Sequence, residues 1–189
     1  MDANGRESVL MNSFEWLGLP VGLVVSDEEI RDAFRTKASD AHPDSGGDEV
    51  EFAAMQAAQE VLFSPARRLK EWLEVKGWEV DSRGMIDSGV MDLFQEVAGV
   101  GSEAEAAVKA KDKAQSALAK GMAEISLMSA REKVGALLSK IVEEIEKRVS
   151  CFPEIEEKGD ASLGAKVMRD LVFLEKWRGT LRGLFGRLM

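Results

Sequence analysis

Apolar residues recur at helical spacing through most of this chain, in stripes separated by polar or glycine-containing segments. The clearest two stripes flank residues 42–47. Ser26 and Glu29, at the start of the first stripe, have the spacing of a capping box. In such a box the hydroxyl and the carboxylate accept hydrogen bonds from backbone N–H groups at the start of a helix. We predict helices over about 27–41 and 49–62. Their stripes are Ile30, Ala33, Phe34, Ala38 and Ala41 in the first, and Phe52, Met55, Ala58, Val61 and Leu62 in the second.

The residues between these two helices predict a tight turn. Pro43 disfavours helical geometry at His42, so the first helix should end there. The run Ser45-Gly46-Gly47 then favours a loop. The two helices are therefore expected to run antiparallel, with His42-Pro43-Asp44 displayed in the turn between them.

Two shorter helices complete an N-terminal domain, which we predict to cover residues 12–78. Phe14, Trp16 and Leu17 suit a short helix that the glycine and proline after it end. Ser64-Pro65 is typical of an N-cap followed by proline at the first helical position. Residues 79–87 are predicted to be a linker.

The C-terminal part, residues 88–189, is predicted to form a three-helix bundle, because short connections make neighbouring helices antiparallel. A short helix should begin near Ser88 and be interrupted at Gly99 and Gly101. A last helix, from about Ser162, carries a long leucine-rich stripe. The chain as a whole is therefore expected to be all-α.

Two further pairs with capping-box spacing mark the predicted starts of the middle helices. Ser102 with Glu105 should open an alanine-rich helix that reaches about residue 127, and Ser129 with Glu132 should open the next one. The inner face of the alanine-rich helix is expected to be Ala106, Ala110, Ala114 and Ala117. In the alternative, two of these segments fuse into one long coiled-coil arm, against which the pair at 129 and 132 argues.

The N-terminal domain resembles the J domain, the co-chaperone module that stimulates ATP hydrolysis by DnaK-type chaperones. The matching motifs are Phe14-Glu15-Trp16-Leu17-Gly18-Leu19, Ile30-x3-Phe34-Arg35, His42-Pro43-Asp44, and Phe52-x2-Met55-x2-Ala58-x2-Val61-Leu62-x2-Pro65-x2-Arg68. The resemblance implies a four-helix domain with an antiparallel hairpin of its second and third helices, and a DnaK-type chaperone as partner. It also implies a set of chaperone-binding residues: His42, Pro43, Asp44, Arg31, Arg35 and Lys37.

Further segments, at the end of the J domain and beyond it, are similar to the HscB-type co-chaperones, which pair a J domain with a three-helix client-binding domain and serve iron–sulfur cluster assembly. These segments are Gly77-Trp78-Glu79-Val80, Val90-Met91-Asp92-x-Phe94 and Leu171-Val172-Phe173-Leu174-Glu175-Lys176. The resemblance implies an apolar client-binding patch of Val90, Met91, Phe94 and Phe173, with an iron–sulfur scaffold protein as the candidate client. In the alternative, these side chains simply fill the bundle core.

The chain departs from the family pattern in charge. Residues 27–41 hold three basic and five acidic side chains, and Asp40 and Ser45 stand where basic residues are usual. In the client segments, Gln95 and Ala98 replace acidic residues and Val172 replaces a basic one. These departures keep open a second function, a J-like interaction or scaffolding protein that does not stimulate ATPase.

Composition excludes several other classes of function. The 189 residues carry a net charge of −9, which argues against nucleic acid as a partner. With one cysteine, Cys151, and one histidine, His42, the sequence offers no metal site and no nucleophilic dyad, and it contains no phosphate- or dinucleotide-binding motif. We therefore expect no enzymatic activity and no cofactor.

The hydropathy pattern argues against a membrane protein. No apolar run approaches about 20 residues, and the N-terminus lacks a signal-peptide core, so we expect a cytoplasmic location. Residues 165–189 hold six basic and two acidic side chains. This basic end suits the solvated face of a bundle helix better than the alternative, contact with an anionic membrane surface.

Overall fold

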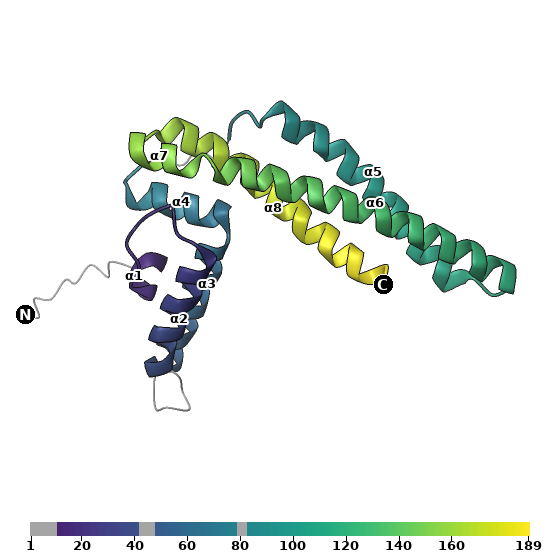
Figure 1. Cartoon of the computed structure of the whole chain (residues 1–189), viewed down its shortest axis with the longest axis horizontal. Coiled ribbons are helices and arrows are strands. Elements are labelled where there is room, and N and C mark those ends of the chain that lie inside the picture. Colours follow the sequence, from purple (N-terminus) through teal and green to yellow (C-terminus); the bar gives the residue numbers. More distant parts are fainter. Residues whose placement is uncertain (1–10, 42–47, 79–82) are drawn as a thin grey trace, which may run out of the picture. The chain divides into compact units, whose positions relative to one another are not determined.

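A computed structural model describes residues 11–41, 48–78 and 83–189, and every regular element in these ranges is an α-helix (Figure 1). The predicted all-α fold is therefore confirmed. The chain divides into two compact units, Met1–Val80 with Phe152–Gly164, and Asp81–Cys151 with Ala165–Met189. The helices are α1 (Ser13–Leu17), α2 (Asp27–Ala41), α3 (Glu49–Phe63), α4 (Pro65–Val75), α5 (Ser88–Lys113), α6 (Ala117–Val149), α7 (Phe152–Lys158) and α8 (Ala161–Arg187).

The first unit is built around the antiparallel hairpin of α2 and α3, as predicted (Figure 1). The predicted capping box opens α2: Glu29 N donates to Ser26 Oγ at 3.1 Å, and Ser26 N donates to the Glu29 carboxylate at 2.7 Å. The two apolar stripes meet and, together with α1, form one core. Its buried residues are Phe14, Leu17, Ile30, Met55, Ala58 and Leu62.

Helix α4 follows α3 and packs against it in the first unit. Its N-cap is Ser64, whose Oγ accepts from Arg67 N at 3.2 Å, with Pro65 at the first helical position as predicted. Farther along α4, the Glu71 carboxylate accepts from the backbone N and the Oγ of Ser13, at 2.8 and 3.0 Å. This carboxylate therefore ties the start of α1 to α4.

A short helix that the sequence analysis did not predict, α7, also belongs to the first unit. Pro153 lies in its first turn, where the missing N–H has no helical partner to lose. The side chains of Phe152 and Ile155 are buried, and the Glu156 carboxylate accepts from Leu23 N at 3.0 Å. Residues 152–164, which lie within the predicted C-terminal bundle, thus pack with the N-terminal residues.

In the second unit, α5 and α6 form a long antiparallel hairpin (Figure 1). Ion pairs between Glu103 and Lys133 and between Glu96 and Lys140 fix its register. Buried residues line the facing sides of the two helices, every three or four positions on α6 and in two separate pairs on α5, and together form one seam. They are Val90, Leu93, Ala104 and Ala107 on α5, and Ala123, Leu127, Ala130, Val134, Leu137, Ile141 and Ile145 on α6.

Helix α8 runs antiparallel to α6 along part of its length. Near one end, the buried carboxylate of Asp170 accepts from Arg148 Nε at 3.3 Å and from Asp87 N at 3.0 Å. Near the other end, Arg131 Nη2 donates to the Leu188 carbonyl at 2.7 Å. Among the residues that the structure describes, the part of the hairpin beyond Arg131 is formed by α5 and α6, because α8 ends at Arg187.

The predicted division of residues 88–152 into helices is wrong. Helix α5 continues through Gly99, Gly101 and the Ser102 capping box, and α6 continues through the pair Ser129 and Glu132. Between Leu93 and Ala104 the side of α5 that faces α6 is only partly buried, at Val97, Val100 and Gly101, but the packing along the whole hairpin outweighs the local signals, which are worth about 1 kcal/mol each. The alternative of a fused coiled-coil arm describes both helices better.

Helix α5 instead ends at Lys113, and residues 114–116 connect it to α6. Ser116 is the N-cap of α6, and its side chain accepts a hydrogen bond from Ala119 N at 3.1 Å. The predicted alanine face is also corrected. Ala106, Ala110 and Ala117 are exposed, whereas Ala104 and Ala107 are buried. The buried side of α5 is the one that continues from Val90 and Leu93 in its N-terminal half, and it is not the side that carries the most alanines.

Across the described ranges, the helices are too short or too polar for any of them to cross a membrane.

Candidate functional site

The α2–α3 hairpin positions the first predicted site. His42, Pro43 and Asp44 lie outside the described residues, but their chain neighbours are defined: α2 ends at Ala41, and Asp48 caps α3 by accepting from Val50 N at 2.7 Å. The packed core fixes the two helices against each other. The tripeptide therefore belongs to the segment that joins two fixed helix ends.

The predicted basic residues of α2 are exposed. The Arg31 guanidinium lies 3.5 Å from the Asp27 carboxylate and 5.4 Å from the centre of the Phe63 ring. Arg35 donates to Asp32 at 2.6 Å. Lys37 extends beside the α1 C-cap, since a Cβ on Gly18 would lie 3.0 Å from Lys37 Cε.

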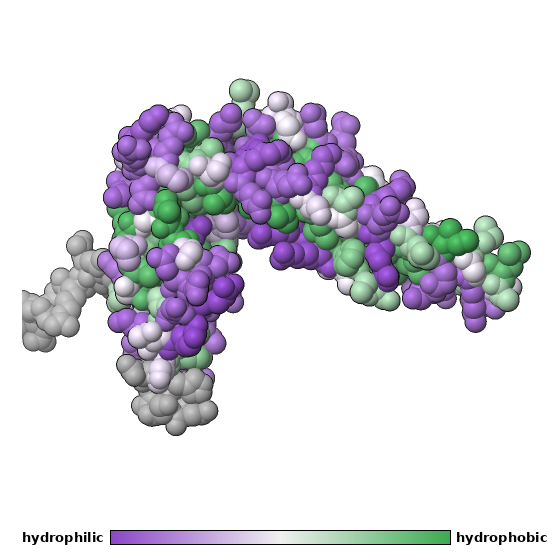
Figure 2. Space-filling model, viewed as in Figure 1, coloured by the Kyte–Doolittle hydropathy of each residue, from purple (hydrophilic) through white to green (hydrophobic). Residues whose placement is uncertain are grey.

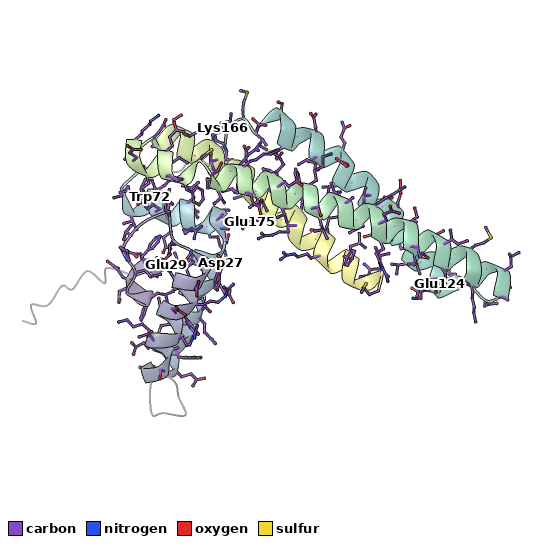
Figure 3. All side chains as sticks on the ribbon, in the orientation of Figure 1. Asp27, Glu29, Trp72, Glu124, Lys166 and Glu175 are labelled. Carbon is purple, nitrogen blue, oxygen red and sulfur yellow. The ribbon has the colours of Figure 1, made fainter. Side chains whose placement is uncertain are left out.

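The charge of the two arginines is therefore offset by acidic residues of α2 itself, which is net acidic. Both arginines face an aspartate of their own helix. The first turn also carries three acidic residues, Asp27, Glu28 and Glu29, of which Asp27 and Glu29 are labelled in Figure 3. The Ser26 backbone N–H and hydroxyl donate to Glu29 and hold the pKa of that carboxyl below its usual value. Exposed ion pairs of this kind are weak, about 0–1 kcal/mol, so a stronger anionic partner can replace them.

The second predicted site lies on α5 and α8. Met91 is 49% exposed, Phe94 54% and Phe173 36%. The rings of Phe94 and Phe173 both approach the ring of Trp177, with centroids 6.2 and 5.9 Å away. The structure thus brings residues from two helices, far apart in sequence, onto one aromatic cluster.

Val90 does not share this surface, because its side chain is fully buried in the α5 seam. It supports the exposed residues from beneath, and the proposed patch is reduced to Met91, Phe94 and Phe173. Sequence reasoning missed Trp177 as the ring that links the two phenylalanines. It also treated Val172 only as a departure from the family, although Val172 is 47% exposed beside Phe173.

In the part of the chain that the structure describes, no three histidine, cysteine, aspartate or glutamate side chains gather to hold a metal ion. The exposed face of α2 carries charged side chains, and the patch on α5 and α8 exposes apolar side chains. Both are suited to protein recognition.

Comparison with known proteins agrees with the fold. Residues 12–70 match the family model of the DnaJ domain. Over 95% of this chain, the structure is similar to all of the chaperone HscB from Vibrio cholerae, with a TM-score of 0.54 and 21% sequence identity. At that identity the likeness shows a common fold. No significant match was found among curated protein sequences.

Proposed function

Because residues 12–70 form a DnaJ domain, we propose that this protein is a co-chaperone that stimulates ATP hydrolysis by a DnaK-type chaperone. The DnaJ match is the observation that carries the proposal, since it covers both arms of the α2–α3 hairpin and the tripeptide between them. A DnaJ domain implies an Hsp70-type partner. We propose that the two proteins meet in the cytoplasm.

In the proposed mechanism, Arg31, Arg35 and Lys37 dock on the chaperone while the tripeptide His42-Pro43-Asp44 acts at its regulatory surface. The chaperone cleaves ATP, and the co-chaperone favours the conformation that does so. No nucleophile or cofactor of this chain takes part. Docking would exchange the Asp27 and Asp32 partners of the two arginines for acidic groups of the chaperone.

We further propose that Met91, Phe94 and Phe173 bind a client, with an iron–sulfur scaffold protein as the candidate. Their exposure supports this, because three large apolar side chains from two helices would otherwise face water. The resemblance to HscB-type co-chaperones supplies the class of client. The fold similarity is consistent with it.

A second candidate function, a J-like scaffold without ATPase stimulation, is favoured by the charge balance of α2. Arginines that already face aspartates attract an acidic chaperone surface more weakly at long range. The test is ATP turnover by a DnaK-type chaperone with and without this protein. A several-fold rise supports the co-chaperone, whereas binding without any rise supports the scaffold.

A further inference from the structure

The distal arm of the α5–α6 hairpin, residues 103–130, carries a row of exposed apolar side chains. Leu118, Met122 and Ile125 are 76%, 63% and 70% exposed, and their spacing of four and three residues puts them on one face of α6. We call these three residues the distal ridge. Apolar surface is also visible at the free end of the arm in Figure 2.

An open groove of about 500 Å³ lies beside the distal ridge, between α5 and α6. Its walls are mostly small residues, with Ile125 at one edge and the Glu103 carboxylate at one end. The lining residues are Glu103, Ala106, Ala107, Ala110, Ile125, Ser126, Ser129 and Ala130. One face of the arm therefore offers both projecting large side chains and a shallow alanine-lined recess.

We propose that this face pairs with the same face of a second copy of the chain. A two-fold contact uses one patch on both subunits, so the patch must complement itself. The register set by the Glu103–Lys133 ion pair places Ala110 level with Ser126 and Ala114 level with Met122. If α5 of each copy lies over α6 of the other, the distal ridge of one enters the alanine side of its partner.

The need of the arm for more packing supports a second copy as the occupant. Within the described ranges α8 ends at Arg187, level with Arg131, and the seam of the hairpin beyond that level is largely alanine, which buries little apolar area per residue. Two such arms together make a four-helix arrangement, the usual way in which long helices bury their apolar faces. In the dimer, each arm would bury the apolar face that it exposes to water in a single copy.

Charge allows this pairing. The acidic residue at the end of the groove, Glu103, is paired with Lys133, and Glu105 lies 3.9 Å from Lys109. Residues 103–130 hold four acidic and four basic side chains, so the arm carries no net charge that would oppose pairing with a second copy.

The size of the patch sets the expected affinity. Residues 103–113 and 117–129 span about 16 and 20 Å at 1.5 Å per residue. A face two helices wide and this long buries roughly 1,000–1,300 Å² in total, at the low end of specific interfaces. We therefore expect a dimer that dissociates in the micromolar range.

Sedimentation of the full chain over a concentration series tests the proposal. The wild type should rise from the monomer mass of 20.7 kDa toward twice that mass. The double variant Met122→Lys, Ile125→Lys should remain a monomer with an unchanged melting temperature, because both side chains are exposed. The control is Met85→Lys, an 87% exposed methionine outside the arm, which should dimerise like the wild type.

Crosslinking tests the arrangement of the dimer. One chain carries Ala110→Cys and a second carries Ile125→Cys, both with Cys151→Ser, and only their mixture should give an abundant disulfide-linked dimer. A wild type that stays monomeric, or lysine variants that dimerise normally, would overturn the proposal. If the wild type is a monomer and the lysine variants lose binding to reduced, alkylated lysozyme, the distal ridge is a site for unfolded chains instead.

Discussion

Phe94 and Val90 lie one helical turn apart on α5, yet Phe94 is 54% exposed and Val90 is fully buried. Their difference follows from the α5 seam, which takes Val90 and Leu93 and leaves Phe94 outside. A family motif that spans both positions therefore combines a packing residue with a surface residue. At the residue scale, the two roles can be separated by substitution.

Phe94→Ala should weaken binding of the candidate iron–sulfur scaffold by about tenfold or more, as the loss of an aromatic anchor does. Its cost in stability should be below about 1.5 kcal/mol, because the ring contacts Trp177 from an exposed position. Val90→Ala should instead destabilise the second unit by about 1–3 kcal/mol through lost burial. A pull-down and a thermal melt of each variant measure the two effects.

The opposite pattern would contradict this assignment. If Phe94→Ala melts as early as Val90→Ala and binds its client normally once folded, the phenylalanine is a packing residue and the patch is not a binding site.

Helices α1 to α4 could be predicted from sequence because their signals are local and agree with one another. The Ser26 capping box, the proline after Ser64 and the glycine after Leu17 each mark an end that the apolar stripes also require. At the element scale, the C-terminal helices differ. Their boundaries depend on a seam that crosses two capping-box spacings and two glycines, and local signals cannot report what a distant helix buries.

The candidate sites were predictable to different degrees. The motif around residue 42 is local in sequence, so it could be recognised without a structure. The meeting of Phe94 and Phe173 on Trp177 depends on how α5 and α8 pack. The same is true of the exposed distal ridge, because its exposure depends on which side of α6 packs against α5.

Gly99 provides a test of the continuous α5 helix. It is exposed, and a Cβ built on it would have no heavy atom within 4 Å, so Gly99→Ala should stabilise the second unit by about 0.5–1 kcal/mol. Denaturant unfolding measures this change. Gly18→Ala serves as the contrast, because Gly18 has a φ of 66° and Lys37 Cε lies close, and it should destabilise the first unit. No gain from Gly99→Ala would argue that the helix breaks there.

At the scale of the whole molecule, the first compact unit is assembled from two separate stretches of chain. Phe152 and Ile155 of α7 are buried within it, with Arg68 lying 5.6 Å from the centre of the Phe152 ring. The predicted linker at 79–87 and the division into two domains at that linker stay a prediction. Their test is whether the N-terminal stretch is stable without α7.

A fragment of residues 1–80 should fold but melt earlier than the same fragment joined through a Gly/Ser linker to residues 152–164. Burial of two large apolar side chains is worth about 2 kcal/mol or more, which corresponds to roughly 10 °C for a domain of this size. Circular dichroism melts of the two fragments give the comparison. Equal melting temperatures would show that α7 contributes nothing to the stability of the first unit.

We propose that the segment His42-Pro43-Asp44, which joins α2 to α3 in the sequence, drives ATP hydrolysis by the partner chaperone. Single-turnover ATP hydrolysis by a DnaK-type chaperone tests it most directly, with the wild type, His42→Gln, and Gln56→Ala as a control at an exposed position of α3. We expect the wild type and Gln56→Ala to accelerate hydrolysis equally and His42→Gln to give the basal rate, with helicity and melting temperature unchanged. Acceleration by His42→Gln equal to that by the wild type would contradict the account.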